Sequence, residues 1–205
     1  MSTEVKTKEK ADMDPKYIIK LTVTLFVTCV IVAGLLGAVD NITREKIAAI
    51  NWDNTVKAMK NVVADPEATT FSDALENTEA MSAAAASAGG TLDSVYEVQV
   101  GGASAGYAIK VIASGSQGNI EMMVGVDGES AVTGVAIVKN SETAGIGSRV
   151  MDNENGVLEQ FEGKSAADGT LVVGTNVDAI TGATVSTKGV TTGVNAALAV
   201  AGAIG

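Results

Sequence analysis

The sequence contains no histidine, one cysteine and two prolines, and aromatic residues make up only 3% of its 205 residues. Without histidine the chain cannot form a Ser-His-Asp or Cys-His catalytic group, and it lacks the commonest transition-metal ligand. A single cysteine excludes an intrachain disulfide and a self-contained cysteine-ligated iron–sulfur cluster. Any redox chemistry of this chain must therefore come from a bound cofactor.

The chain is acidic, with a formal net charge of -10. Such a charge disfavours nucleic acid as a partner, and the aromatic residues are too few to form a stacking surface for bases. Acidic clusters at 127–129 and 152–154 lack the number of ligands found in an EF-hand loop. We therefore predict no nucleic-acid partner, no metal site and no catalytic residue within the chain.

One apolar run, Leu21–Val39, carries no charge. At about 1.5 Å per residue it spans about 28 Å, close to the hydrocarbon thickness of a bilayer. The run is longer than the apolar region of a cleaved signal peptide, and no good cleavage site follows it. The sequence therefore predicts an uncleaved transmembrane helix over 21–39.

The charges that flank this run predict its orientation. Five lysines precede it, whereas only Arg44 and Lys46 follow closely. The positive-inside rule then places the tail 1–20 in the cytoplasm and the rest of the chain outside the cell membrane. We predict a cytoplasmic tail over 1–20, a span over 21–39, a helical connector and loop over 40–91, and one extracytoplasmic domain over 92–205.

Apolar periodicity assigns the elements outside the span. Helical spacing predicts a helix that continues or restarts beyond the span and ends before Asp65-Pro66, and a second helix over 72–81. The small, uncharged stretch 82–90 is predicted to be a loop. Four short apolar or alternating runs between glycine-containing turns are typical of an antiparallel meander. These runs are 96–100, 106–113, 120–126 and 132–138.

Three further elements complete the predicted domain. A short helix is expected over 155–161, a short strand over 171–173, and an alanine-rich terminal helix over 186–200. Strands that are grouped together, with helices at both ends, indicate an α+β fold with an antiparallel sheet and flanking helices.

The most informative segment precedes the terminal helix and reads Asp178-Ala179-Ile180-Thr181-Gly182-Ala183-Thr184. It fits the acceptor pattern of flavin transferases: Asp, two free positions, Ser or Thr, Gly, Ala, Thr. A helix N-terminus favours phosphate, Gly182 allows close backbone approach, and Ala183 leaves space beside it. Asp178 can orient the loop or assist the transferase. The alternative is that these hydroxyl residues only cap a helix.

Hydroxyl groups around this segment are candidate phosphate ligands. Thr181, Ser186 and Thr187 can each donate a hydrogen bond to a phosphate oxygen. Thr184 has a different predicted role, because it stands at the acceptor position of the pattern and has the primary role if its hydroxyl is esterified.

A second candidate segment is the loop Glu142-Thr143-Ala144-Gly145-Ile146-Gly147. Gly145 and Gly147 can direct backbone N–H groups at a flavin ring, and Ile146 can cover its face. Glu142 and Thr143 can hydrogen-bond ring or ribityl positions. Taken alone, this motif is also typical of an ordinary glycine turn.

With these two motifs, the chain resembles the G subunit of the Rnf electron-transport complex and, more distantly, the C subunit of the sodium-pumping NADH:quinone reductase. The resemblance implies a membrane anchor and an extracytoplasmic FMN-binding domain. It also implies that an FAD-dependent, Mg²⁺-requiring flavin transferase attaches FMN to Thr184 through a phosphoester. Ala144 and Ile146 stand where the family usually has Pro and Leu, so we expect a less rigid loop that keeps its aliphatic bulk.

The resemblance further implies the cellular role. Such a subunit relays electrons alongside the other membrane and peripheral subunits of a complex that couples ferredoxin–NAD electron transfer to Na⁺ or H⁺ movement. Two alternatives are a pilin-like structural membrane protein and an FMN-binding membrane sensor. Pilins normally carry an acidic residue early in the apolar helix, and this span has none; sensors usually carry further modules.

Overall fold

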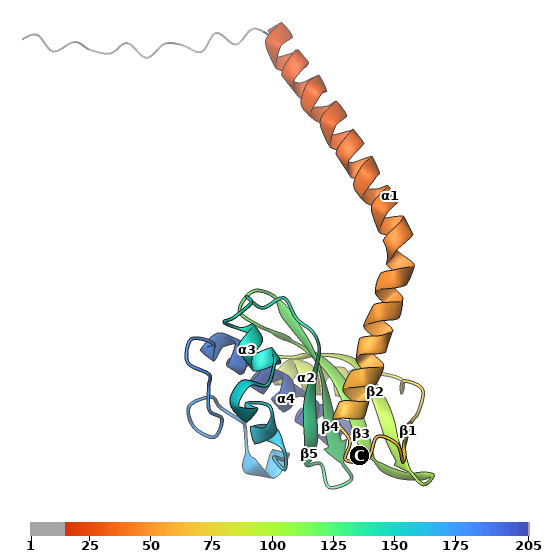
Figure 1. Ribbon diagram of the computed structural model, residues 1–205, viewed down its shortest axis with the longest axis vertical. Coiled ribbons are helices and arrows are strands. Elements are labelled where there is room, and N and C mark those ends of the chain that lie inside the picture. Colours follow the sequence, from red (N-terminus) through yellow and green to blue (C-terminus); the bar gives the residue numbers. More distant parts are fainter. Residues whose placement is uncertain (1–14, 205) are drawn as a thin grey trace, which may run out of the picture. The chain divides into compact units, whose positions relative to one another are not determined.

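The computed structural model describes residues 15–204, which divide into two compact units at Ala49 and Ile50. The helix α1, Pro15–Asn61, is continuous across this division, so the helix predicted beyond the span does not restart after a break (Figure 1). It ends a few residues before Asp65-Pro66. The predicted domain boundary at residues 91 and 92 stays a prediction.

The apolar part of α1 is long and apolar enough to cross a membrane, and the apolar window contains no buried residue. Three threonines return their hydroxyls to carbonyls one turn earlier: Thr22 donates to Ile18 at 2.9 Å, Thr24 to Lys20 at 2.8 Å and Thr28 to Thr24 at 2.8 Å. These bonds leave none of the three hydroxyl donors unpaired, so the threonines are compatible with a hydrocarbon environment.

A five-stranded antiparallel sheet with the order β1-β2-β3-β4-β5 forms the centre of the second unit (Figure 1). Its strands are β1 Thr69–Phe71, β2 Thr91–Val100, β3 Ala103–Ser114, β4 Asn119–Asp127 and β5 Val132–Lys139. The meander predicted from the sequence is confirmed, whereas β1 is an additional edge strand that the sequence analysis missed. Alternate residues of each strand face opposite sides, so the sheet has two apolar faces to cover.

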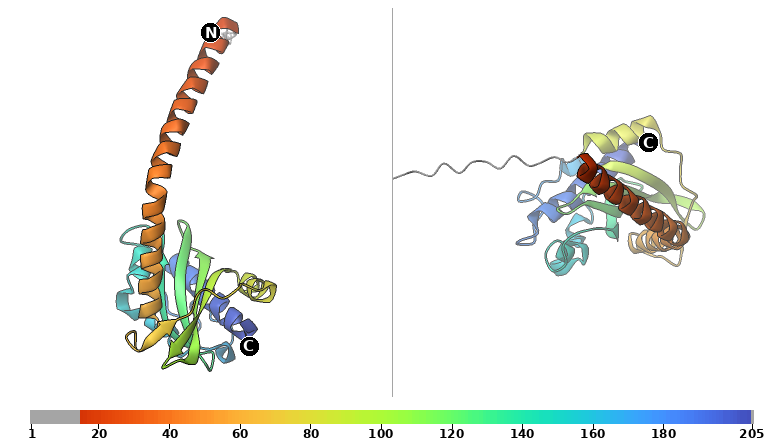
Figure 2. Two further views of the ribbon diagram at one scale, coloured as in Figure 1. Left: turned by 90° about the vertical axis from the view of Figure 1, so that its right-hand side faces the viewer. Right: turned by 90° about the horizontal axis from the view of Figure 1, so that it is seen from above.

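One face of the sheet packs against α2, Glu79–Ser87, and α4, Thr184–Ile204 (Figure 2). Small residues allow α4 to lie close to the strands. A Cβ atom on Gly189 would lie 2.7 Å from the Ser114 carbonyl oxygen, and one on Gly193 would collide with the side chain of Met122. Gly189 and Gly193 are therefore needed for the close approach of helix and sheet.

The other face packs against the last turns of α1. Ala58 and Met59 of α1, and Val62 just after its end, are buried against side chains that include Tyr96 and Met123. The strands thus lie between two helical layers, and the predicted α+β class with flanking helices is confirmed.

The segment predicted to be a loop over 82–90 mostly belongs to α2, and the helix predicted over 72–81 is wrong for most of its length. Thr78 caps α2, because its hydroxyl accepts from the Met81 N–H at 3.2 Å. Alanine has the highest helix propensity, and packing against α4 outweighs the apparent looseness of this run.

The region after β5 is irregular. The helix α3, Ser148–Met151, is followed by three short 3₁₀ turns: η1 Glu154–Gly156, η2 Glu159–Phe161 and η3 Ala166–Asp168. A single helix over 155–161 is therefore wrong. Asn153, Asn155 and Gly156 have φ angles of 55°, 59° and 68°, and such left-handed residues cannot continue a right-handed helix.

The strand predicted over 171–173 is also absent. Val173 and Val177 form an isolated bridge to each other, and the described segment between η3 and α4 has no other ladder pairing. The acceptor motif therefore follows an irregular segment rather than a strand.

Candidate functional site

The acceptor motif forms an exposed turn that leads directly into α4, which begins at Thr184 rather than at the predicted Ser186. Thr184 is exposed, whereas Ala183 before it is buried and anchors the turn. Gly182 has a φ of +85°, and no atom beyond its immediate neighbours lies within 4 Å of the position a Cβ would take. The backbone at Gly182 is therefore open to a ligand in a conformation that favours glycine.

The first turn of α4 provides hydrogen-bond donors beside Thr184. The first amides of any helix have no partner within the helix. Among the described residues, no acceptor pairs with the backbone N–H of Thr184, Val185 or Ser186, whereas the Thr187 N–H donates to the Ala183 carbonyl at 2.9 Å. Free N–H groups and the positive end of the helix dipole suit a phosphate group.

A pocket of about 170 Å³ brings the two predicted motifs together at this turn. Its lining consists of Ser116, Glu142, Thr143, Ile146, Gly147, Gly182, Ala183, Thr184, Val185 and Ser186. All of these except Ser116 and Val185 were predicted site residues. The loop over 142–147 and the N-terminus of α4, far apart in sequence, therefore line one cavity.

Glu142 joins three segments around the pocket. One carboxylate oxygen accepts from the backbone N–H groups of Ser116 at 2.7 Å and Gln117 at 3.2 Å. The other oxygen accepts from the Ser186 hydroxyl at 2.5 Å. A Cβ atom on Gly147 would collide with this carboxylate, so the glycine makes room for the contact.

The hydroxyls expected to reach a phosphate differ in their availability. Thr181 is exposed, but Ser186 and Thr187 are buried. Ser186 donates to Glu142, and the Thr187 hydroxyl donates to the Ala183 carbonyl at 3.1 Å. Because a hydroxyl has one donor proton, Ser186 and Thr187 stabilise the turn in this structure rather than point outwards.

The glycine loop is held by hydrogen bonds despite the alanine at 144. The Thr143 carbonyl accepts from the N–H groups of Ile146 and Ser148, each at 3.2 Å, and the Gly145 N–H donates to the Ser148 hydroxyl at 2.9 Å. Ile146 and Val185, which both line the pocket, are 52% and 57% exposed. Two exposed aliphatic side chains thus line the pocket and can contact an apolar ring.

Asp178 and Thr181 line a neighbouring pocket of about 310 Å³ with Arg149 and Glu154. Arg149 donates to both carboxylate oxygens of Glu154, at 2.6 and 2.7 Å, and to the Thr181 carbonyl at 3.3 Å. These hydrogen bonds hold the pKa of Glu154 below its ordinary value and raise the pKa of Arg149. The sequence analysis missed Arg149, because no local pattern links it to residue 181.

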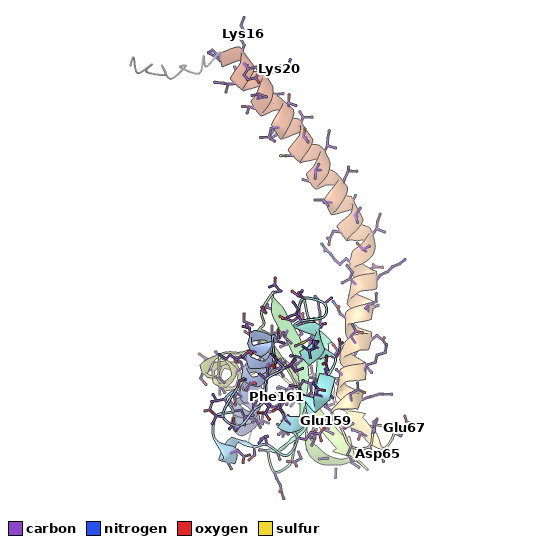
Figure 3. The ribbon with its side chains drawn as sticks, turned by 60° about the vertical axis from the view of Figure 1, so that its left-hand side comes forward. Lys16, Lys20, Asp65, Glu67, Glu159 and Phe161 are labelled. Carbon is purple, nitrogen blue, oxygen red and sulfur yellow. The ribbon has the colours of Figure 1, made fainter. Side chains whose placement is uncertain are left out.

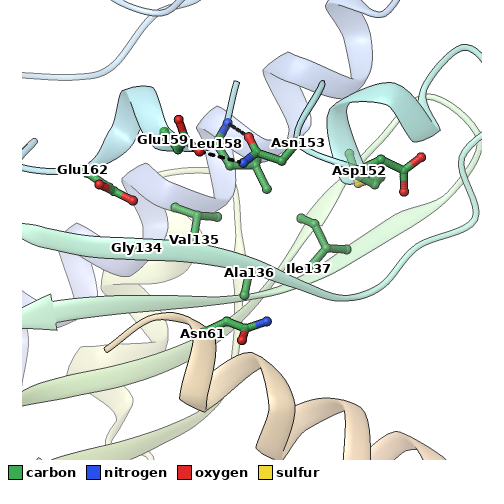
Figure 4. Close-up of a pocket in the computed structure, with 11 residues that line it drawn as sticks. Asn61, Gly134, Val135, Ala136, Ile137, Asp152, Asn153, Leu158, Glu159 and Glu162 are labelled. Atoms are coloured by element: carbon green, nitrogen blue, oxygen red, sulfur yellow. Dashed lines mark hydrogen bonds between the residues drawn. The ribbon is translucent and has the colours of Figure 1, made fainter. Parts of the chain in front are cut away.

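A third pocket, of about 410 Å³, lies along β5 and contains none of the predicted site residues (Figure 4). Asp152, Glu159 and Glu162 contribute carboxylates to its lining. The described residues contain no group of three or more side chains that could hold a metal ion. We therefore assign the candidate site to the turn at Thr184.

Residues 115–199 match the family model of the FMN-binding domain. This match covers β4, β5, the loop over 142–147, the turn at Thr184 and most of α4, so this part of the chain is an FMN-binding domain. The chain is 31% identical to the G subunit of the Na⁺-translocating ferredoxin:NAD⁺ oxidoreductase complex of Acetobacterium woodii, over 96% of this chain and 97% of that protein. It is 29% identical to the G subunit of an ion-translocating oxidoreductase complex of Methanosarcina acetivorans, over 90% and 95% of the two chains.

The chain therefore belongs to the family of G subunits of the ion-translocating (Rnf) oxidoreductase complexes, as the motifs predicted. Among solved structures, it is similar to the C subunit of the Na⁺-translocating NADH-quinone reductase from Parabacteroides distasonis, with a TM-score of 0.51 and 19% identity over 76% of this chain and 94% of that one. That likeness supports the fold alone. The family does not favour the pilin-like or sensor alternatives.

Proposed function

We propose that this chain is the membrane-anchored flavoprotein subunit of an ion-translocating ferredoxin:NAD⁺ oxidoreductase and that it carries one FMN esterified to Thr184. The observation that carries this proposal is the exposed Thr184 hydroxyl at the start of α4, in the pocket that the loop over 142–147 also lines. An FMN-binding domain and membership of the G-subunit family support the cofactor and the complex.

Attachment requires a flavin transferase that uses FAD and Mg²⁺. The Thr184 oxygen attacks the FAD phosphorus that bears the riboflavin group, and a phosphoester bond forms. The pyrophosphate bond breaks, AMP leaves, and the hydroxyl proton passes to a base of the transferase. The threonine and FAD supply every atom of the product, so no oxidant or reductant is needed.

The residues around Thr184 fit a bound FMN. The free N–H groups of the first turn of α4 suit its phosphate, and the open backbone at Gly182 leaves space beside it. Ile146 and Val185 offer aliphatic contacts to the ring, while Glu142 ties the loop over 142–147 to Ser186 in the first turn of α4. When bound, FMN supplies the electron transfer that these side chains cannot perform themselves.

The apolar part of α1 anchors the subunit in the cell membrane. The lysine-rich tail favours a cytoplasmic N-terminus and an extracytoplasmic FMN domain. Outside the cytoplasm free FMN is scarce, so a covalent link prevents loss of the cofactor. Protease added outside intact spheroplasts should digest the domain; a domain that stays protected there would contradict the orientation. The partners are the other membrane and peripheral subunits of the complex.

The direct test is the mass of the native full-length chain. Co-expression with a flavin transferase should add the mass of one FMN less one water, located on the peptide that contains Thr184. Thr184→Ala should abolish the label completely. The free energy of unfolding should change by no more than about 0.5 kcal/mol, because the side chain is exposed.

Thr184→Ser is the matched control, because it keeps the hydroxyl and should retain labelling. Covalent flavin on the Thr184→Ala protein would refute the assignment of the residue. A wild-type chain that stays unlabelled beside an active transferase would refute covalent attachment altogether.

A further inference from the structure

Gln160, which lies outside the acceptor motif, hydrogen-bonds both backbone groups of Asp178, the first residue of that motif. The Asp178 N–H donates to Gln160 Oε1 at 2.7 Å, and Gln160 Nε2 donates to the Asp178 carbonyl at 3.1 Å. The same nitrogen donates to the Val157 carbonyl at 2.7 Å. With both N–H groups and the oxygen of the carboxamide in use, Gln160 pairs with Asp178 as a neighbouring strand would.

Gln160 is fixed within the turn η2, which also carries Glu159 and Phe161 (Figure 3). Phe161 is fully buried in the apolar core, so it ties this turn to the body of the domain. Arg149 adds a second contact from outside the motif, to the Thr181 carbonyl. The first and fourth residues of the motif are therefore attached through their backbones to the preceding irregular region.

The backbone at Asp178 needs this support. Val177 and Ile180 are buried, but the backbone between them belongs to no strand or helix, and Asp178 and Ala179 are exposed. An exposed segment without ladder bonds samples many conformations, whereas an enzyme that modifies it must bind one of them.

We propose that Gln160 is a positioning residue for flavin attachment. By fixing the backbone of Asp178, it presents the Asp178 carboxylate and the Thr184 hydroxyl to the flavin transferase in one geometry. The proposal rests on the proposed function and extends it. It states that a residue outside the seven-residue motif helps to hold the acceptor loop in the conformation that the flavin transferase binds.

The expected kinetic effect follows from the population of the competent loop. If only a fraction of the chains presents the loop correctly, the apparent affinity for the transferase falls by that fraction, while the chemical step is unchanged. Gln160→Ala should therefore raise the KM of the acceptor chain by about tenfold, the scale of one or two lost hydrogen bonds. The kcat should stay within about twofold, and Thr184 should still become fully labelled after long incubation.

The experiment uses the purified, unflavinylated full-length chain in detergent, with FAD, Mg²⁺ and a flavin transferase. Initial rates are measured by flavin fluorescence of the denatured protein over a range of acceptor concentrations. Hydrogen exchange of the Asp178 amide in the unlabelled chain gives an independent readout, and it should be faster in the Gln160→Ala chain.

Asn195 offers a matched control within the same domain. Its carboxamide accepts from the Leu171 N–H at 3.0 Å and donates to the Leu171 carbonyl at 2.9 Å, the same pairing at a position before the motif. Asn195→Ala removes an equivalent pair of bonds but leaves Asp178 held. Its KM and the exchange of the Asp178 amide should match those of the wild type.

The outcomes distinguish the proposed function from the positioning role. A wild-type chain that takes no label refutes the proposed function. Labelled wild type with an unchanged KM for Gln160→Ala overturns the positioning role, and so does an equal rise in KM for the Asn195 variant, which would indicate general loosening. If Gln160→Ala does not fold, Gln160→Glu replaces it as the test variant. This change keeps the oxygen that accepts from the Asp178 N–H but removes the donor to the Asp178 carbonyl, and the KM of this variant must still exceed that of the wild type.

Discussion

Two segments pair their backbone polar groups in opposite ways: the anchor, which is the 21–39 part of α1, and the lead-in segment 169–183, which precedes Thr184. In the 21–39 part of α1 the backbone partners lie close in sequence, because a helix pairs each N–H with a carbonyl four residues earlier, and Thr22, Thr24 and Thr28 follow the same rule with their hydroxyls. The lead-in segment has one isolated bridge and depends on distant side chains such as Gln160 and Asn195.

The anchor therefore depends only on its apolar composition, whereas the lead-in segment depends on particular side chains at particular positions. Apolar substitutions in the anchor keep its hydrogen bonds, because these belong to the backbone. In the lead-in segment, by contrast, replacing Gln160 or Asn195 removes the hydrogen-bond partners of one backbone N–H and one backbone carbonyl. We therefore expect function to be more sensitive to single substitutions around Thr184 than to most apolar exchanges in the anchor.

We expect the largest effect from a charge placed in the anchor, because it changes the apolar composition on which the anchor depends. Val30 lies at the centre of the 21–39 run and is exposed. Val30→Lys should disfavour insertion by about 3 kcal/mol, because a lysine at the bilayer centre is costly to insert. The chain should leave the membrane fraction, and its domain should become protected from protease added outside spheroplasts.

Val30→Leu is the control, since it changes shape but not polarity, and it should insert as the wild type does. Equal insertion of the lysine variant would show that composition does not specify the anchor.

A smaller effect is expected where α4 lies against the sheet. Gly189→Ala should destabilise the chain by about 1–3 kcal/mol, because the new Cβ would lie 2.7 Å from the Ser114 carbonyl oxygen of the backbone. Urea unfolding of the full-length chain in detergent measures this change.

Gly202→Ala in the same helix is the matched control, because no atom lies within 4 Å of its new Cβ. It should stabilise the chain by up to about 1 kcal/mol through helix propensity alone. A stabilising Gly189→Ala would show that the close approach of α4 is not required.

The smallest effect concerns pH and the pair of Arg149 with Glu154. Hydrogen bonds from Arg149 lower the pKa of Glu154 from 4.5 in the folded state. The stability from this shift is fully present above pH 4.5, the value in the unfolded chain, and is lost as pH falls through the lower folded pKa. The urea midpoint of the wild type should therefore exceed that of Glu154→Gln slightly at neutral pH.

This small difference should shrink as the solution becomes more acidic than the folded pKa of Glu154. A constant difference between the two chains at all pH values would mean that the carboxylate charge does not contribute.

The sequence allowed prediction of the meander and the terminal helix, because their alternating and helical periodicities agree with their burial. It failed at α2, where a run of alanines has no polar face to reveal its orientation. It also failed over 155–161, where asparagines adopt left-handed conformations that periodicity does not encode. At the site, the pocket unites the loop over 142–147 with Thr184, but Arg149 and Gln160 carry no sequence signal for their contacts.

By itself, the sequence determined that any redox chemistry must come from a bound cofactor. It also determined where the apolar run lies and which hydroxyl is the candidate for attachment, because these follow from residue types and their local order. Only the tertiary structure decided that Glu142 joins the loop over 142–147 to α4, that Ser186 and Thr187 turn inwards, and that Gln160 holds the backbone of Asp178. The contacts of Glu142 with Ser186 and of Gln160 with Asp178 connect residues that are 44 and 18 positions apart. Their partners are chosen by the packing of the whole domain rather than by local pattern.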